Sequence, residues 1–204
     1  PRSTLFPYTT LFRSVDHFNS FILTRWESDE ALRDTILASL GDVPVLQYLH
    51  IRSIHDPCQQ VLNPPGTACA CGELTWTNNV GFRPEDICEL RDNHPDWFLR
   101  DENGEVIFHP AINEAMMDIG NPGWQQFWLQ RTVEMQEEYG WQGVFLDNVM
   151  ASLSGHQRRN EALANYPDNE AYQAAMEDFL RYIYTEYFQP QGIPLYGNIT
   201  EARD

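Results

Sequence analysis

Asp147 and Asn148 are the residues of this sequence whose types and position best suit chemistry. They directly follow Val144-Phe145-Leu146, an uninterrupted apolar run typical of a parallel strand that is covered on both faces. Loops gather and ligands bind at the carboxyl ends of parallel strands, so a carboxylate at this point can serve as a nucleophile, base or acid. The alternative interpretation is that Asp147 or Asn148 only caps the segment that follows.

A helix before this strand would hold it in place. Asn121 and Pro122 form a helix start, with an amide at the cap and a proline at the first helical position. Gly140 is a left-handed stop, so a helix is predicted over residues 122–139. Mostly apolar side chains recur along it at threes and fours and form one face: Trp124, Phe127, Trp128, Thr132, Met135 and Tyr139. Helix, glycine, buried strand and acid together make half of a βαβ unit.

The stretch from Asp118 to Val149 resembles the centre of carbohydrate-active (β/α)8 barrels. In those barrels a segment Asp-(Ile/Leu/Phe)-x-Asn-Pro precedes a helix, and the next strand ends in Gly-(Val/Phe)-x-(Leu/Ile)-Asp. The run Gly-Val-Phe-Leu-Asp-Asn-Val is nearly a signature of the glycoside hydrolases related to endo-α-1,4-polygalactosaminidase, and it occurs here at residues 143–149. The resemblance implies a TIM barrel that cleaves glycosidic bonds, with Asp147 as a catalytic carboxylate.

Strand patterns near residues 18–24, 44–51, 143–149 and 193–199, separated by helical patterns, predict an α/β fold with about four parallel strands. We therefore expect a partial, truncated TIM (β/α)8 barrel, since complete barrels run to roughly 250 residues. Residues 4–14 resemble a translated sequencing adapter, so we expect residues 1–14 to be non-native and residues 15–204 to be a fragment of one glycosidase-like domain. The sequence leaves the localisation and the oligomeric state of the protein open, and secretion is compatible with it.

The charge of the chain excludes some partners. A net charge of −17, from 30 acidic and 13 basic residues, argues against binding to nucleic acid or to an anionic membrane surface. No apolar run approaches the ~18 residues of a membrane span. A neutral or cationic carbohydrate substrate is compatible with this charge. No phosphate loop, Gly-x-Ser-x-Gly or His-Glu-x-x-His motif occurs, so neither a cofactor nor a metal is predicted.

A long excursion between Ser53 and Asp96 has no sustained period and is predicted to cross the top of the barrel as a βα loop. It holds all four cysteines: Cys58, Cys69, Cys71 and Cys88. Their spacing is no recognised zinc pattern, so two disulfides in an exported enzyme are the first interpretation. Zinc, with His55 or His94, and free thiols are the alternatives. Trp76 lies in the same loop and could stack on a sugar or pin the loop itself.

Four further side chains are candidates for substrate binding. Tyr48 and His50 alternate with apolar residues and point one way near the end of the strand at residues 44–51, although His50 could equally be a satisfied core histidine. Asn103-Gly104 between apolar arms predicts a β-hairpin over residues 97–108. By the resemblance, Trp97 and this hairpin form one wall of the cleft. The resemblance also places Asp118 close under the site, whereas its position before the helix suits orienting backbone N–H groups.

Glycoside hydrolysis needs a second carboxylate. A helix over residues 168–188 leads into the strand at residues 193–199, which ends near Asn198 and Glu201. Glu201 is the candidate partner of Asp147, and the alternative is a carboxylate in a later part of the barrel that this sequence does not include. Asn148 and Asn198 are candidates for holding the sugar or orienting the carboxylates. A glycoside hydrolase acting on an oligo- or polysaccharide is the predicted function. A non-catalytic carbohydrate-binding or scaffold barrel is the first alternative, and a metal-dependent barrel hydrolase is the second.

Overall fold

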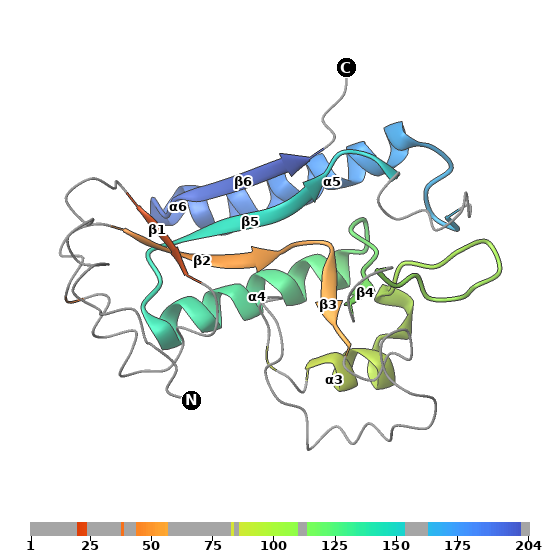
Figure 1. Ribbon diagram of the computed structural model, residues 1–204, viewed down its shortest axis with the longest axis horizontal. Helices are drawn as coiled ribbons and strands as arrows, with labels where there is room; N and C mark the ends of the chain where they lie inside the picture. The colour runs from red at the N-terminus through yellow and green to blue at the C-terminus, as the bar shows by residue number, and fades with distance from the viewer. Residues whose placement is uncertain are drawn as a thin grey trace, which may run out of the picture.

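Four parallel strands lie side by side at the centre of the computed structural model, which describes residues 20–23, 38, 44–56, 83, 86–109, 114–153 and 163–200. Their order is β1 (Phe21–Leu23), β2 (Val45–His50), β5 (Gly143–Met150) and β6 (Leu195–Thr200). All three neighbouring pairs are parallel, so the carboxyl ends of the strands lie together (Figure 1). The four predicted strands are confirmed, and within the predicted residues 18–24 the structure describes a strand over Phe21–Leu23.

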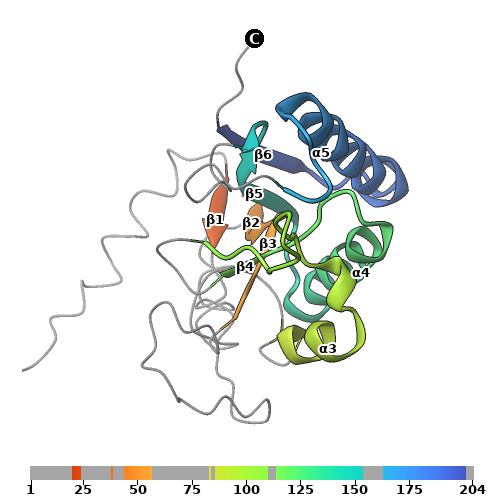
Figure 2. The same ribbon diagram turned by 90° about the vertical axis from the view of Figure 1, so that its right-hand side faces the viewer.

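The sheet curves, and helices cover its outer face (Figure 2). Each of the two crossovers that the structure describes contains a long helix, α4 (Pro122–Tyr139) before β5 and α5 (Asn169–Ile183) before β6. This is half of a (β/α)8 barrel, as the sequence predicts. The sequence after Ser28 also has a helical pattern, and this segment lies outside the described residues except for Ala38, which is helical.

Helix α4 begins and ends as its sequence predicts. The Asn121 side chain accepts hydrogen bonds from the backbone N–H groups of Gly123 and Trp124, and Gly140 ends the helix with a left-handed φ of 70°. Two of its buried tryptophans hold the carboxyl end of β2. Trp128 Nε1 donates to the carbonyl oxygen of His50 at 2.8 Å, and Trp124 Nε1 donates to that of Ile51 at 3.1 Å. The packing of α4 therefore fixes the strand end that carries His50.

Helix α5 begins at the Asp168 cap, whose carboxylate accepts from Ala171 N at 2.8 Å. Its apolar side chains recur at threes and fours and are buried: Tyr172, Met176, Phe179 and Ile183. The predicted single helix is more irregular at its end, where a π-helical turn (Tyr184–Phe188) leads into α6 (Gln189–Gln191).

A small antiparallel unit lies at the carboxyl end of the sheet (Figure 1). Strand β3 (Ser53–His55) follows β2 directly and pairs with β4 (Glu114–Met116), and helix α3 (Asp86–Asn93) precedes the hairpin. The prediction of an irregular excursion over residues 53–96 is therefore wrong at both of its ends. A three-residue strand and an eight-residue helix are too short to show a period in the sequence.

The predicted hairpin is confirmed. Arg100 and Val106 form an antiparallel bridge, and the turn closes through Gly104 with a φ of 86°. The hairpin also pairs with β4, since Leu99 N donates to Met116 O at 2.9 Å. It therefore forms part of the rim above the carboxyl ends of the strands.

Cys88 on α3 is disulfide-bonded, which confirms the first interpretation for this cysteine and excludes it as a zinc ligand. The other three cysteines, Cys58, Cys69 and Cys71, lie outside the described residues. The partner of Cys88 is therefore one that the structure does not describe. A covalent bond thus ties α3 to the part of the chain that precedes it.

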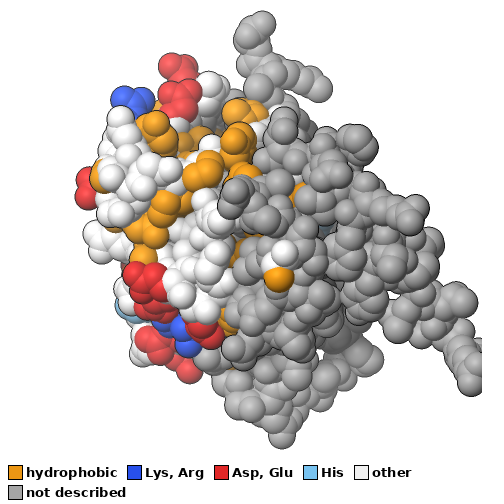
Figure 3. Space-filling model, turned by 90° about the vertical axis from the view of Figure 1, so that its left-hand side faces the viewer, with side chains coloured by type: hydrophobic (Ala, Val, Ile, Leu, Met, Phe, Trp, Pro, Cys, Tyr) orange, Lys and Arg blue, Asp and Glu red, His pale blue; other side chains and the backbone are white. Residues whose placement is uncertain are grey.

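The two ends of the sheet differ in character. At the end where the strands begin, a band of hydrophobic side chains crosses the described surface, with charged side chains of both signs above and below it (Figure 3). The polar cluster around Asp147 lies at the opposite end. None of the described helices combines the length and the apolar character needed to cross a bilayer.

Candidate active site

A β-bulge at the end of β5 places Asp147 and Asn148. Leu146 pairs with Gly197 and Val149 pairs with Ile199, so two residues of β5 face the single residue Asn198 of β6. Asn148 has a φ of 55°, a left-handed conformation that asparagine tolerates better than most residues. In a regular strand, successive side chains point to opposite faces of the sheet, so Asn148 would point toward the helices if Asp147 points away from them. The bulge instead leaves both polar side chains beside β2, where Asn148 Nδ2 lies 3.3 Å from His50 Nε2.

Three donors hold the carboxylate of Asp147. The Tyr48 hydroxyl donates a short hydrogen bond to Oδ2, and Asn198 Nδ2 donates to Oδ1 at 2.8 Å. The backbone N–H of Asn148 also donates to the carboxylate. Asp147 therefore does more than cap the following segment, because donors from three strands converge on it.

These contacts decide the charge of Asp147. Burial by itself raises the pKa of Asp147, but the hydrogen bonds from Tyr48, Asn198 and Asn148, with nearby His50, outweigh it and lower the pKa below the usual value. Burial and the bond to Asp147 raise the pKa of the Tyr48 hydroxyl, so Tyr48 stays protonated and donates. The site thus holds an ionised carboxylate next to a neutral phenol.

His50 lies beside this carboxylate and is only 7% exposed. In the β2–β5 register it pairs with Asp147, and its Nε2 lies 3.1 Å from the Tyr48 hydroxyl oxygen and 4.0 Å from Asp147 Oδ2. Its other nitrogen, Nδ1, lies 3.5 Å from the carboxylate of Glu114. The imidazole therefore separates two carboxylates.

Glu114 and Ser53 are site residues that the sequence did not reveal. The Ser53 hydroxyl donates to Glu114 Oε2 at 2.8 Å, and Glu114 is 2% exposed. Burial by itself raises the pKa of Glu114, but His50 and Ser53, with a contribution from His109, lower it overall. The only sequence signal was an acid directly before the apolar run Ala115-Met116-Met117, which is too weak to predict a function.

Three aromatic residues lie on the same strands, two residues before the polar side chains of His50, Asp147 and Asn198. Tyr48, Phe145 and Tyr196 occupy neighbouring positions on β2, β5 and β6, and the rings of Tyr48 and Phe145 stack with centroids 6.1 Å apart. Their rings lie on the face of the sheet that carries Asp147.

Asp118 lies in a cluster of its own. Its carboxylate accepts from the Tyr166 hydroxyl in a short hydrogen bond, from Asn165 Nδ2 at 2.6 Å and from Gly120 N at 3.1 Å. The bond from Gly120 confirms that Asp118 orients backbone N–H groups ahead of α4. Its contact with a substrate stays a prediction.

Of the remaining predicted site residues, the structure describes only Trp97. Trp97 stacks on His94 with centroids 3.8 Å apart and packs against α4 at Gly123, so it secures the rim. Trp76 and Glu201 lie outside the described residues. Within the described part of the chain, no three His, Cys, Asp or Glu side chains are grouped to hold a metal ion.

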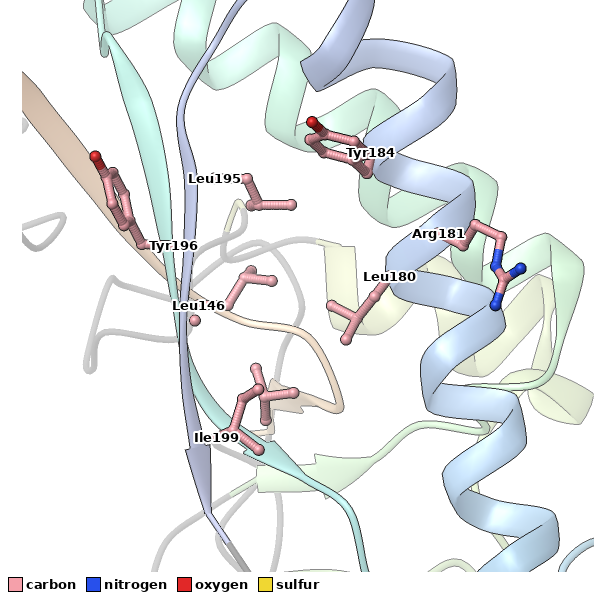
Figure 4. Close-up of a pocket in the computed structure, with 9 residues that line it drawn as sticks. Leu146, Leu180, Arg181, Tyr184, Leu195, Tyr196 and Ile199 are labelled. Carbon is pink, nitrogen blue, oxygen red and sulfur yellow. The ribbon is translucent and has the colours of Figure 1, made fainter. Parts of the chain in front are cut away.

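An apolar cavity of about 350 Å³ lies on the other face of the sheet, between β6 and α5 (Figure 4). Leu146, Leu195 and Ile199 point toward α5 there, whereas the ring of Tyr196 points to the opposite side of β6. Tyr48, His50 and Asp147 share the face of Tyr196, so this cavity is separate from the polar cluster.

Comparison with known proteins agrees with this fold. The structure is similar to the glycoside hydrolase domain of PelA from Pseudomonas aeruginosa, with a TM-score of 0.52 and 16% identity over 92% of this chain and 55% of that chain. It is also similar to the maltogenic α-amylase AmyB from Thermotoga neapolitana, with a TM-score of 0.51 and 12% identity over 93% of this chain and 41% of that chain. A third similar structure is the α-galactosidase from Lactobacillus brevis, with a TM-score of 0.53 and 7% identity over 94% of this chain and 24% of that chain.

These similarities establish the fold as a partial TIM barrel of the kind found in glycosidases, and the chain spans about half the length of the PelA domain. No curated protein sequence matches the chain. A family model matches residues 76–203, more than half of the 204 residues. The chain therefore belongs to hypothetical glycosyl hydrolase family 15.

Proposed function

We propose that the domain to which this chain belongs hydrolyses glycosidic bonds of an oligo- or polysaccharide, with Asp147 as one of two catalytic carboxylates. The observation that carries the proposal is an ionised carboxylate at the carboxyl end of a barrel strand, held by Tyr48 and Asn198. Catalytic groups of TIM-barrel enzymes gather at that end. Membership of a glycosyl hydrolase family supports the same activity.

The charge of Asp147 favours one of its two conceivable roles. A general acid must hold its proton near the working pH and therefore needs a raised pKa. The pKa of Asp147 is lowered, so it acts as the nucleophile or the general base. The proton for the leaving group then comes from a second carboxyl group.

Glu201 is the proposed acid, because it follows β6 directly and β6 neighbours β5. A separation of about 5 Å between the two carboxyl groups would give retention of configuration, and roughly 6.5–9.5 Å would give inversion. Glu114 does not suit this role, since it is buried behind His50 and already accepts from Ser53.

The amides complete the proposed site. Asn198 is exposed and needs only one of its N–H groups for Asp147, so the rest of its amide can bind a sugar hydroxyl. Asn148 lies on the same face and can act in the same way.

Replacing Asp147 by Asn tests the proposal, because Asn keeps the shape and can still accept from Tyr48 but lacks the charge. Release of reducing sugar from a substrate that the parent protein hydrolyses should fall by about 10³-fold, within the range of about 10²–10⁴-fold for general-base catalysis. The control is Asp178→Asn on the exposed face of α5, which should leave activity unchanged. Near-normal turnover of a folded Asp147→Asn variant would remove Asp147 from the mechanism and favour a carbohydrate-binding barrel.

A further inference from the structure

Side chains bind both backbone polar groups of Asn148, the residue at the bulge of β5. Its N–H donates to the carboxylate of Asp147, and its carbonyl oxygen accepts from Arg52 Nε at 3.1 Å. A bulge interrupts the ladder of backbone hydrogen bonds, so the backbone groups within it need partners of another kind. Asp147 and Arg52 supply those partners here.

These two hydrogen bonds lie on either side of the backbone torsions of Asn148. The N–H belongs to the peptide plane before Asn148 and the carbonyl group to the plane after it, and each plane is rigid. Holding both planes therefore fixes the φ and ψ angles between them. The φ of 55° is left-handed and unfavourable for a residue with a Cβ atom, so the bulge needs contacts that keep it in this conformation.

Arg52 meets Asn148 from a fixed position. It lies between β2 and β3, and its carbonyl oxygen accepts from Met117 N at 2.9 Å. The residue is only 5% exposed, and its Nη1 lies 3.9 Å from Met116 Sδ of β4. The backbone and the end of this long side chain are thus both held by segments other than β5.

The guanidinium group of Arg52 also lies near α5. Burial raises the pKa of the Tyr172 hydroxyl, and the nearby charge of Arg52 acts in the opposite direction. Tyr172 is fully buried on α5. Arg52 therefore connects the end of β2 with β4, with the bulge of β5 and with α5.

We propose that Arg52 is a positioning residue for Asp147, and that it acts by holding the carbonyl oxygen of Asn148 and with it the bulge. The bulge then aims the backbone N–H of Asn148 at the Asp147 carboxylate and keeps the Asn148 amide 3.3 Å from His50 Nε2. The effect of Arg52 on catalysis rests on the proposed function, whereas its effect on the carboxylate of Asp147 does not.

The competing role for Arg52 is purely structural, as a buried cation between the strands and α5. The two roles differ in the atom that matters. A structural cation needs the positive charge, whereas holding the bulge needs the N–H group at Nε, which donates to Asn148. Lysine separates the roles, because it keeps the charge but has a methylene group at the place of Nε.

Arg52→Lys and Arg52→Met both remove this donor, and only the first keeps the charge. Carbon NMR of protein labelled with ¹³C at the aspartate carboxyl groups measures the pKa of Asp147, whose signal is assigned by its loss in Asp147→Asn. We expect this pKa to rise in both variants, since the hydrogen bond from Asn148 is one of the contacts that lower it. A parental pKa in either folded variant would overturn the proposal.

The other groups that act on Asp147 stay the same in these variants. Within the described part of the chain, the titratable side chains in contact with Asp147 are Tyr48 and His50, both from β2. Strand β6 contributes the amide of Asn198. A rise in the pKa therefore reports on the bulge.

Arg131→Met is the matched control. Arg131 is a partly buried arginine of α4, and its Nε and Nη2 donate to the buried Asp86 at 3.1 and 2.9 Å. Its replacement should lower stability and leave the pKa of Asp147 at the parental value. An equal rise in Arg131→Met would mean general loosening and would overturn the proposal. If neither Arg52 variant folds whereas Arg131→Met does, Arg52 serves the fold, and the proposal is again overturned.

Kinetics adds the functional readout. We expect kcat/KM to fall by about 10²-fold in Arg52→Lys, the loss that a misplacement of about 1 Å can cause. The acidic limb of kcat/KM should move to higher pH together with the pKa of Asp147. A limb that stays in place while the pKa measured by NMR has risen would refute the action of Arg52 on catalysis. A parent protein that hydrolyses no glycoside would refute the proposed function and leave the NMR result standing.

Discussion

Tyr48→Phe is the most direct perturbation of the candidate site. The substitution keeps the ring that stacks on Phe145 and removes one oxygen. That oxygen donates to Asp147 and contacts His50 Nε2 at 3.1 Å, so a single atom links the two groups. No other contact of the ring needs to change.

The magnitude follows from the nature of the lost bond. A hydrogen bond to a charged group contributes about 1.5–3 kcal/mol to stability. Tyr48 and Asp147 are both partly exposed, so water can replace part of the loss. We expect the variant to lose about 1–2 kcal/mol of unfolding free energy. The pKa of Asp147 should rise, because the hydrogen bond from Tyr48 is one of the contacts that lower it.

The sign of the pH dependence follows from linkage. The folded-state pKa of Asp147 is lowered, so its ionisation stabilises the fold above the unfolded-state pKa, near 4, and this contribution is lost as pH falls through the folded-state value. The stability difference between parent and Tyr48→Phe should therefore be largest near neutral pH and shrink in acid. If Asp147 is the base or nucleophile, the acidic limb of kcat/KM moves to higher pH.

Chemical denaturation at pH 7 and at pH 3 measures the first effect, and a pH–rate profile measures the second. Tyr184→Phe is the matched control, because this tyrosine is 46% exposed on the π-helical turn and its hydroxyl is remote from the cluster. Equal stability of Tyr48→Phe and parent at both pH values, with an unmoved acidic limb, would refute the role assigned to Tyr48.

Two other predictions follow from single features of the fold. Asn148→Gly should fold with near-parent stability, because glycine accepts a φ of 55°, whereas Asn148→Val should lose about 1–3 kcal/mol; equal melting curves would contradict the strained bulge. Cys88 should resist alkylation in unfolded, unreduced protein, and reduction should lower stability by about 2–4 kcal/mol; peptide mapping that finds alkylated Cys88 would contradict the disulfide.

Local sequence was sufficient for the elements that form the half-barrel. The apolar run Val144-Phe145-Leu146 and the stripe of α5 are properties of neighbouring residues, and they predict a strand and a helix wherever those segments pack. The caps of α4 are local too, because Asn121 and Gly140 satisfy backbone groups of their own helix. Asp147 could be found in the same way, as the acid that ends a buried strand.

The surroundings of Asp147 could not be found this way, because they come from distant segments. Ser53 and Glu114 are 61 residues apart, and they meet only because β3 and β4 pair antiparallel above the sheet. Tyr48 and Asp147 are 99 residues apart and meet through the parallel register of β2 and β5.

The bulge at Asn148 likewise depends on how β5 pairs with β6, since the same residues would alternate faces in a regular strand. Local sequence thus determined which segments are strands and helices and which acid ends a strand. Strand pairing alone decided which side chains share the site, and therefore the charge that Asp147 carries there.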